Sequence, residues 1–129
     1  MGDRCYMQIT CRRIDQDRFQ ALGFHAEYDA PENPPLVELI DEEANYAHYD
    51  ELPRDLPYHG FHGPGGNYGA HHLACDGKQY ADVETGHDGG YLIHWNDATR
   101  QPDEPSLRRI HEYLAILESA RQQLTTNQG

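Results

Sequence analysis

The most constraining feature of this sequence is the dipeptide Asp76-Gly77, which stands between two stretches of strand-like residues. A tight two-residue hairpin turn needs positive φ at both central positions, and Asp-Gly is one of the sequences that accept it. The pattern therefore predicts an antiparallel hairpin of residues 69–75 and 78–84. A further turn leads into residues 91–95, which we expect to complete a three-stranded antiparallel meander.

Residues 4–12 predict another strand, because apolar and polar side chains alternate along them. The face expected to point inward consists of Cys5, Met7, Ile9 and Cys11. A strand over residues 36–40 follows two prolines and is apolar on both faces apart from Glu38. This pattern is typical of a strand at the centre of a sheet.

Two helices complete the expected elements. A short helix after Asp15 would turn Phe19 and Leu22 inward, and a long helix over 104–124 would begin with Pro105 in its first turn. The long helix carries a stripe of apolar residues at helical spacing. Its members are Leu107, Ile110, Leu114, Leu117 and Leu124.

These elements follow one another as strand, helix, strand, long loop, three strands and helix. The order indicates an α+β fold with a mostly antiparallel sheet of about five strands and the long C-terminal helix packed on one face. The length of 129 residues fits a single domain, which we place at 1–124. Residues 41–68 lack periodicity and are expected to form a long irregular loop, and 125–129 a disordered tail.

The sequence also disfavours several classes of protein. No run approaches the ~20 consecutive apolar residues of a membrane-spanning helix, and the first residues lack the apolar stretch of a signal peptide. Of the cysteines Cys5, Cys11 and Cys75, the first two would lie ~20 Å apart on one strand, too far for a disulfide. We therefore expect reduced cysteines and a cytoplasmic protein.

Acidic residues dominate the charge of the chain. Asp and Glu number 22 against 10 Lys and Arg, which gives a formal net charge of −12 at pH 7. Nucleic-acid phosphates need cationic contacts, so direct binding to a nucleic acid is disfavoured. A basic protein partner, such as one that itself binds nucleic acid, is favoured because opposite charge speeds association.

The candidate partner-binding surface combines carboxylates with tyrosines, which supply contact area at low entropic cost. Its residues are Asp41, Glu42, Glu43, Tyr46, Tyr49, Asp50, Glu51, Asp55 and Tyr58. They predict a non-enzymatic acidic binding or inhibitor protein. The alternatives are an acidic surface that serves solubility alone and a small domain that dimerises or acts as a scaffold.

Nine histidines raise a different function, the binding of a zinc-type metal ion. Zinc favours nitrogen and sulfur ligands, and a spacing of two to four residues lets a chain present them in pairs. On a strand, residues 71 and 75 share one face. The candidate ligands are His59, His62, His71 and Cys75, with His87 as a substitute. No two-cysteine knuckle or His-Glu-x-x-His motif is present, so ordinary surface histidines are the competing interpretation.

Other chemistry finds little support in the sequence. The glycine-rich segment 60–69 matches neither the dinucleotide fingerprint nor the Walker pattern, since no Lys-Ser/Thr follows it. A thiolate pair of Cys75 and His71 lacks an identifiable residue to orient it. Protonation of the histidines near their usual pKa of ~6.5 offers a pH switch as another interpretation. No catalytic residue is assigned.

Overall fold

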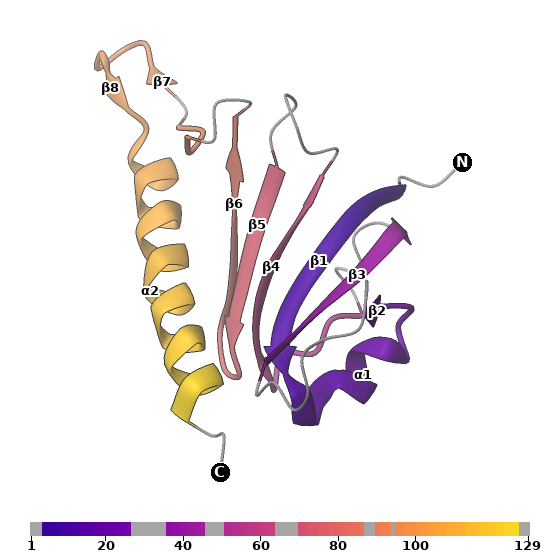
Figure 1. Cartoon of the computed structure of the whole chain (residues 1–129). Helices are drawn as coiled ribbons and strands as arrows, with labels where there is room; N and C mark the ends of the chain where they lie inside the picture. Colours follow the sequence, from indigo (N-terminus) through magenta and orange to yellow (C-terminus); the bar gives the residue numbers. More distant parts are fainter. Residues whose placement is uncertain are drawn as a thin grey trace.

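The computed structural model describes residues 4–26, 36–45, 51–63, 70–86, 90–93 and 95–126. Its principal strands are β1 (Arg4–Arg12), β2 (His25–Ala26), β3 (Leu36–Asn45), β4 (Pro57–Gly63), β5 (Ala70–Asp76) and β6 (Tyr80–Thr85). They form one six-stranded sheet in the order β2-β3-β1-β4-β5-β6 (Figure 1). Every neighbouring pair is antiparallel. The predicted α+β class is therefore confirmed.

The helices lie on different parts of this sheet. A short 3-10 turn, η1 (Arg13–Asp15), continues into α1 (Gln16–Gln20), whereas the long helix α2 spans Glu104–Thr126. α2 contacts β4, β5 and β6, and α1 lies near the other end of the sheet (Figure 1). A hairpin of β7 (Trp95–Asn96) and β8 (Gln101–Pro102) projects beyond the start of α2. No helix in the described part of the chain combines the length and the apolar character needed to cross a membrane.

The larger core packs β1, β3, β4 and β5 against α1 and the segment that precedes β4. Met7, Ile9 and Cys11 of β1 are fully buried, which confirms the predicted inward face for these three side chains. Phe19 of α1 packs edge-on against Tyr58 of β4, with the ring centroids 5.4 Å apart. This end of the sheet is therefore held together by apolar burial.

The smaller core lies between α2 and the outer strands of the sheet. Its buried members are Ala74, Val83, Ile110, Tyr113 and Ile116. The predicted place of Leu114 in the helix core is wrong, because its side chain is 40% exposed. The sheet instead receives the helix face that carries Tyr113 and Ala120, two residues outside the predicted leucine stripe. α2 also continues to Thr126, into the expected tail, and residues 127–129 lie outside the described residues.

The assignment of 41–68 to an irregular loop is wrong for two parts of it. β3 extends to Asn45, and residues 57–63 form β4. β4 pairs with β1 on one side and β5 on the other, and a central strand does not need the alternation that reveals a half-exposed one. Its glycine at position 60 is required by packing, because a Cβ there would overlap the carbonyl oxygen of Gln8.

The turn between β5 and β6 forms at the predicted place but is longer than predicted. Gly77 has a φ of +92°, the left-handed conformation that glycine accepts most readily. The Asp76 carboxylate accepts hydrogen bonds from the backbone N–H groups of Lys78 (2.9 Å) and Gln79 (2.7 Å). Asp76 thus stabilises the turn through its side chain, as turn-forming aspartates commonly do.

The third strand predicted at 91–95 is wrong. Tyr91 makes an isolated bridge to Thr85, and the chain then leaves the sheet, because Trp95–Asn96 pairs with Gln101–Pro102 instead. The meander of the structure is therefore β4, β5 and β6. This rearrangement leaves β6 as the last strand of the six-stranded sheet.

Candidate functional site

The acidic residues expected to meet a partner lie on two segments of the structure. Asp41 and Glu42 belong to β3, and Glu51 and Asp55 to the segment that precedes β4. Glu42, Glu51 and Asp55 are exposed, whereas Asp41 is half-buried. The side chain of Glu43 and the residues Tyr46, Tyr49 and Asp50 lie outside what the structure describes. Glu42 and Glu51 therefore face solvent.

The charge of Asp55 is compensated within the molecule. Its carboxylate forms an exposed ion pair with Arg18 of α1, with an N–O distance of 3.2 Å. The hydrogen bond from Arg18 lowers the pKa of Asp55 below its usual value, so the pair stays charged at neutral pH. Exposed pairs of this kind contribute little to stability. The pairing with Arg18 nevertheless reduces the net charge that Asp55 offers to a partner.

Tyr58 cannot belong to a binding surface, because its side chain is fully buried in the larger core. Its hydroxyl donates a hydrogen bond to the carbonyl of Pro53 (2.7 Å) and accepts one from Arg54 (3.1 Å). Burial raises the pKa of this hydroxyl above its usual value. The expected exposure of Tyr58 came from treating its segment as a loop, whereas the residue belongs to the central strand β4.

The predicted zinc ligands are not brought together. The strand register pairs His62 with His71 but Cys75 with Tyr58, in the buried core. His59 and His62 are three residues apart on β4, so they point to opposite faces. Across the described residues, no three His, Cys, Asp or Glu side chains are grouped to hold a metal ion. His87, the proposed substitute, lies outside the described residues.

The thiol of Cys75 is enclosed rather than reactive. It donates a weak hydrogen bond to the carbonyl of Arg54, with an S–O distance of 3.7 Å. Burial raises the pKa of this thiol, which disfavours the thiolate that metal binding or nucleophilic attack would need. His71 does share a strand face with Cys75, as the spacing predicts, but the register places each beside a different residue of β4.

Two of the predicted ligands do form a close pair. The imidazoles of His62 and His71 stack, with centroids 5.0 Å apart and an interplanar angle of 14°. The Nε2 atom of His71 lies 3.6 Å from a carboxylate oxygen of Asp82 and 3.8 Å from one of Glu84, both on β6. Burial and the neighbouring His71 lower the pKa of His62 to about 4. His62 is therefore neutral at neutral pH.

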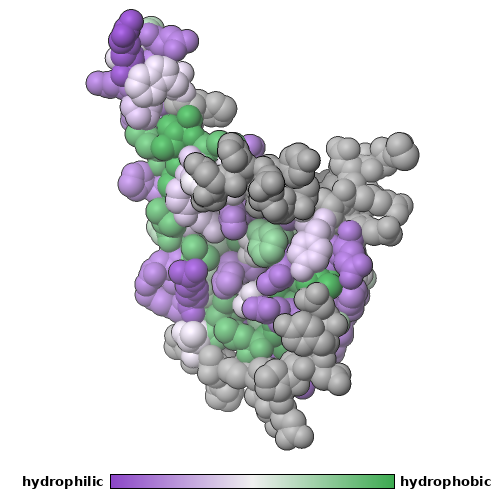
Figure 2. Space-filling view, turned by 45° about the horizontal axis from the view of Figure 1, so that its top comes forward, coloured by the Kyte–Doolittle hydropathy of each residue, from purple (hydrophilic) through white to green (hydrophobic). Residues whose placement is uncertain are grey.

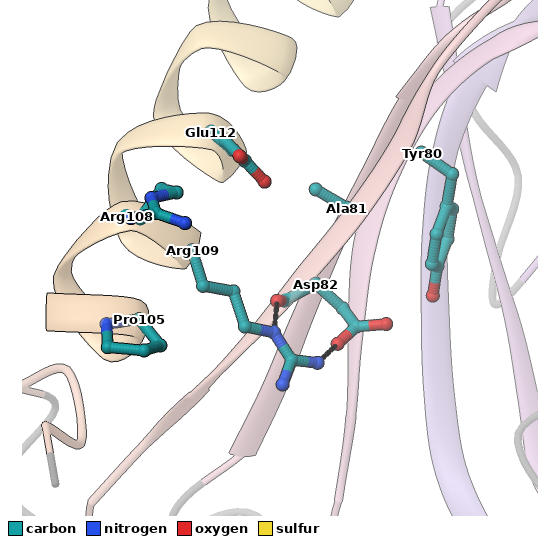
Figure 3. Close-up of a pocket in the computed structure, with 7 residues that line it drawn as sticks. All are labelled: Tyr80, Ala81, Asp82, Pro105, Arg108, Arg109 and Glu112. Atoms are coloured by element: carbon teal, nitrogen blue, oxygen red, sulfur yellow. Dashed lines mark hydrogen bonds and ion pairs between the residues drawn. The ribbon is translucent and has the colours of Figure 1, made fainter. Parts of the chain in front are cut away.

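Sequence reasoning missed the polar contact that joins α2 to the edge of the sheet. The Nε of Arg109 donates a hydrogen bond to the backbone carbonyl of Asp82 (2.9 Å), and its guanidinium also pairs with the Asp82 carboxylate (Figure 3). Interactions with His71 and Arg109 lower the pKa of Asp82 to about 2. The two partners lie 27 positions apart, so no local pattern connects them. The contact could be anticipated only once β6 is known to be an edge strand.

Sequence reasoning also misassigned the apolar residues that follow β6. Tyr91, Leu92, Ile93 and Trp95, expected in a strand, are between 42% and 59% exposed. Figure 2 shows hydrophobic surface on the α2 side, directly below the hydrophilic hairpin of β7 and β8. Large apolar side chains exposed as a group commonly mark a contact surface for another protein.

Comparisons of the chain with protein-family models, with curated proteins and with solved structures found no match. The surface of the molecule itself carries three candidate features: the exposed acidic residues, the exposed apolar segment after β6, and the edge of β6 with its arginine contact.

Proposed function

We propose that this chain is a non-enzymatic binding or inhibitor protein whose partner is a basic protein. The observation that carries the proposal is the net charge of −12 together with acidic side chains that face solvent. Exposed acidic residues in the described part of the chain are Asp17, Glu38, Glu42, Glu51, Asp55, Glu84, Asp97, Glu104, Glu112 and Glu118. Such a surface attracts a cationic partner and repels the phosphates of a nucleic acid.

The exposed apolar segment supports a protein as the partner. Binding interfaces combine an apolar centre with a polar rim, and Tyr and Trp are enriched in them. Tyr91, Leu92 and Trp95 supply the apolar area, and Glu84 and Asp97 are exposed nearby in sequence. A basic protein with an apolar patch fits this combination better than a small ion or a nucleic acid. A cytoplasmic setting belongs to the same proposal and is supported by the free thiols of Cys11 and Cys75.

The experiment that tests this function is affinity capture from a lysate of the cells that encode the chain. We expect the immobilised protein to retain one basic protein, identified by mass spectrometry, and to release it as salt rises toward 500 mM, because exposed charges are screened. Retention of nothing, or of an acidic protein unaffected by salt, would sink the proposal.

A pair of charge variants tests which acidic residues matter. Glu42→Gln combined with Glu51→Gln should weaken capture at low salt by roughly five- to tenfold, since each exposed charge contributes up to about 1 kcal/mol. Asp17→Asn combined with Glu118→Gln removes the same charge from other exposed positions and should weaken capture less. Equal loss in the two double variants would show that total charge, and not the surface at β3 and the 51–56 segment, directs binding.

A further inference from the structure

The edge of β6 directs backbone hydrogen-bonding groups away from the sheet. The carbonyls of Asp82 and Glu84 accept hydrogen bonds from Arg109 (2.9 Å) and from the N–H of Leu92 (3.0 Å), neither of which belongs to β5. In an antiparallel pair, outward-facing and inward-facing residues alternate along the strand. Tyr80, Asp82 and Glu84 are therefore the residues of β6 whose backbone faces outward. An edge of this kind can accept a further strand.

A groove follows the same edge, between β6 and helix α2. Two adjoining cavities of about 470 and 480 Å³ lie there, and Tyr80 and Glu112 line both. The strand wall begins at Gln79 and the helix wall ends at Ile116. Figure 3 shows Arg109 reaching from α2 to Asp82 across this space. An edge strand faced by a helix provides both the backbone groups and the side-chain pockets that recognition of an extended peptide requires.

Arg109 already makes the contacts that a basic strand would make at this edge. It satisfies an outward carbonyl and a carboxylate of the same residue, Asp82. Its side chain is 60% exposed, so little packing holds it in place. Covering an edge strand with a neighbouring helix is a common protection against unwanted pairing, and Arg109 makes this contact from α2. Arg109 therefore protects the edge and can be displaced from it.

The charge of the β6 edge determines which kind of extended segment can bind there. Asp82 and Glu84 are two residues apart on β6, so their side chains share one face of the sheet. A strand added beside residues 80–82 would place one side chain opposite the Asp82 carboxylate and diagonal to that of Glu84, where a cationic residue forms favourable cross-strand pairs. Glu112 adds a further carboxylate on the helix wall, and the charge of Arg108 on the same wall is compensated by its ion pair with Glu104.

We propose that the groove between β6 and α2 binds an extended basic segment of the partner protein, which pairs with residues 80–82 as a seventh strand and displaces Arg109 from Asp82. The inference rests on the proposed function, since it names the part of the basic partner that is recognised. The stretch from Glu84 onward is covered by the bridge of Thr85 with Tyr91 and the contact of Leu92, so the added strand is short.

The test uses the full chain and a synthetic peptide of about eight residues in which arginine and valine alternate. Binding is followed by fluorescence anisotropy, and backbone hydrogen exchange is measured by NMR. We expect exchange at the amides of Tyr80 and Asp82 to slow by about tenfold on binding, because an added strand would accept hydrogen bonds from them. The amides of His25 and Ala26, at the opposite edge of the sheet, should not change. A peptide with glutamate in place of arginine should not bind.

Two arginine variants separate displacement of Arg109 from a general effect of charge. Arg109→Gln and Arg18→Gln change the net charge equally, but Arg18 pairs with Asp55 near the other end of the sheet and does not line the groove. We expect Arg109→Gln to tighten binding of the arginine–valine peptide about five- to tenfold and Arg18→Gln by less than about twofold. Thermal unfolding of both variants checks that they remain folded.

Three outcomes would overturn the inference. The first is no binding of the arginine–valine peptide up to ~1 mM, a very weak affinity for a specific site. The second is binding that protects other amides and leaves β6 unchanged. The third is self-association of the Arg109→Gln variant through β6, which would make a second copy of the chain the occupant.

Capture of a basic protein from lysate without protection of β6 would remove this inference and keep the proposed function. Failure of capture would remove the function.

Discussion

The two ends of the sheet are held in different ways. Around β1 and α1, fully buried apolar side chains such as Ile9 and Phe19 form a continuous core. At β6 the apolar core is smaller, and exchangeable polar contacts join the strand to its surroundings: Arg109 with Asp82, and His71 beside the same carboxylate. The main core therefore lies away from the exchangeable polar contacts of β6. Under our proposal, a partner replaces polar contacts at β6 and leaves the main core undisturbed.

The largest expected effect comes from a substitution in the core near β1. Phe19→Ala should lower the free energy of unfolding by about 4 kcal/mol, because a fully buried phenylalanine leaves a cavity when truncated. Ile116→Ala, in the smaller core, should cost about 2 kcal/mol, since its side chain is already 9% exposed and borders the groove. Urea unfolding measures both. Equal losses would show that the two ends of the sheet contribute equally to stability.

The histidine pair predicts a smaller, pH-dependent effect. The pKa of His62 is about 4 in the folded chain and ~6.5 when unfolded, so the unfolded state binds the proton more readily. Stability is therefore full above pH 6.5 and falls as the pH drops toward 4. After allowance for solvent at this half-buried site, the loss should be about 2 kcal/mol. Urea midpoints at pH 7 and 4.5 measure it, before most carboxylates titrate.

The control for this prediction is a pair of histidine substitutions. His62→Gln should reduce the change in urea midpoint between the two pH values, because it removes the group whose pKa is shifted. His111→Gln, at an exposed position of α2, should leave the change as it is. Burial also lowers the pKa values of His59 and His72, so part of the pH dependence should persist in the His62 variant. If the difference between the two urea midpoints were the same in His62→Gln as in the unchanged protein, the assignment of this pH dependence to the stacked pair would be contradicted.

The helix offers a sharper comparison within the smaller core. Leu114→Asp should cost no more than about 1 kcal/mol, because the side chain already meets solvent. Ile110→Asp, four residues earlier, should cost more than about 3 kcal/mol, since it would bury a carboxylate against Val83. Thermal unfolding of the two variants decides whether the helix turns Tyr113 or Leu114 toward the sheet. A larger loss in the Leu114 variant would restore the leucine stripe as the core face.

The elements with local patterns were predictable from the sequence. The alternation around Ile9, the turn at Gly77 and the long helix are confirmed, because each depends on residues close together in the chain. β4 was not predictable in the same way, since a central strand shows no alternation and Gly60 resembles a loop residue. The pairing partners of a strand are set by residues far away in sequence, which is why 91–95 was placed in the wrong sheet.

The candidate site was likewise predictable only where it depends on residues close together in the chain. Glu42 and Glu51 were found from composition, and the structure leaves both exposed. The predicted zinc ligands are not brought together, because Cys75 and His71 lie four residues, or ~13 Å, apart on β5. The strand register, which the sequence does not show, then places His71 beside His62 and Cys75 beside Tyr58. The contact of Arg109 with Asp82 could not be seen without the strand order, because it depends on β6 being an edge.

The smallest expected effect is also the one that best tests the separation of stability from recognition. Arg109→Gln should change the free energy of unfolding by less than about 1 kcal/mol, because the ion pair with Asp82 is largely exposed on the arginine side. The same variant should alter peptide binding at β6 by a larger factor, since the freed carbonyl becomes available to an added strand. Urea unfolding and anisotropy on one preparation compare the two effects. A loss of stability of several kcal/mol would show that Arg109 anchors α2 to the sheet, and the β6 end would then be structural like the core at β1.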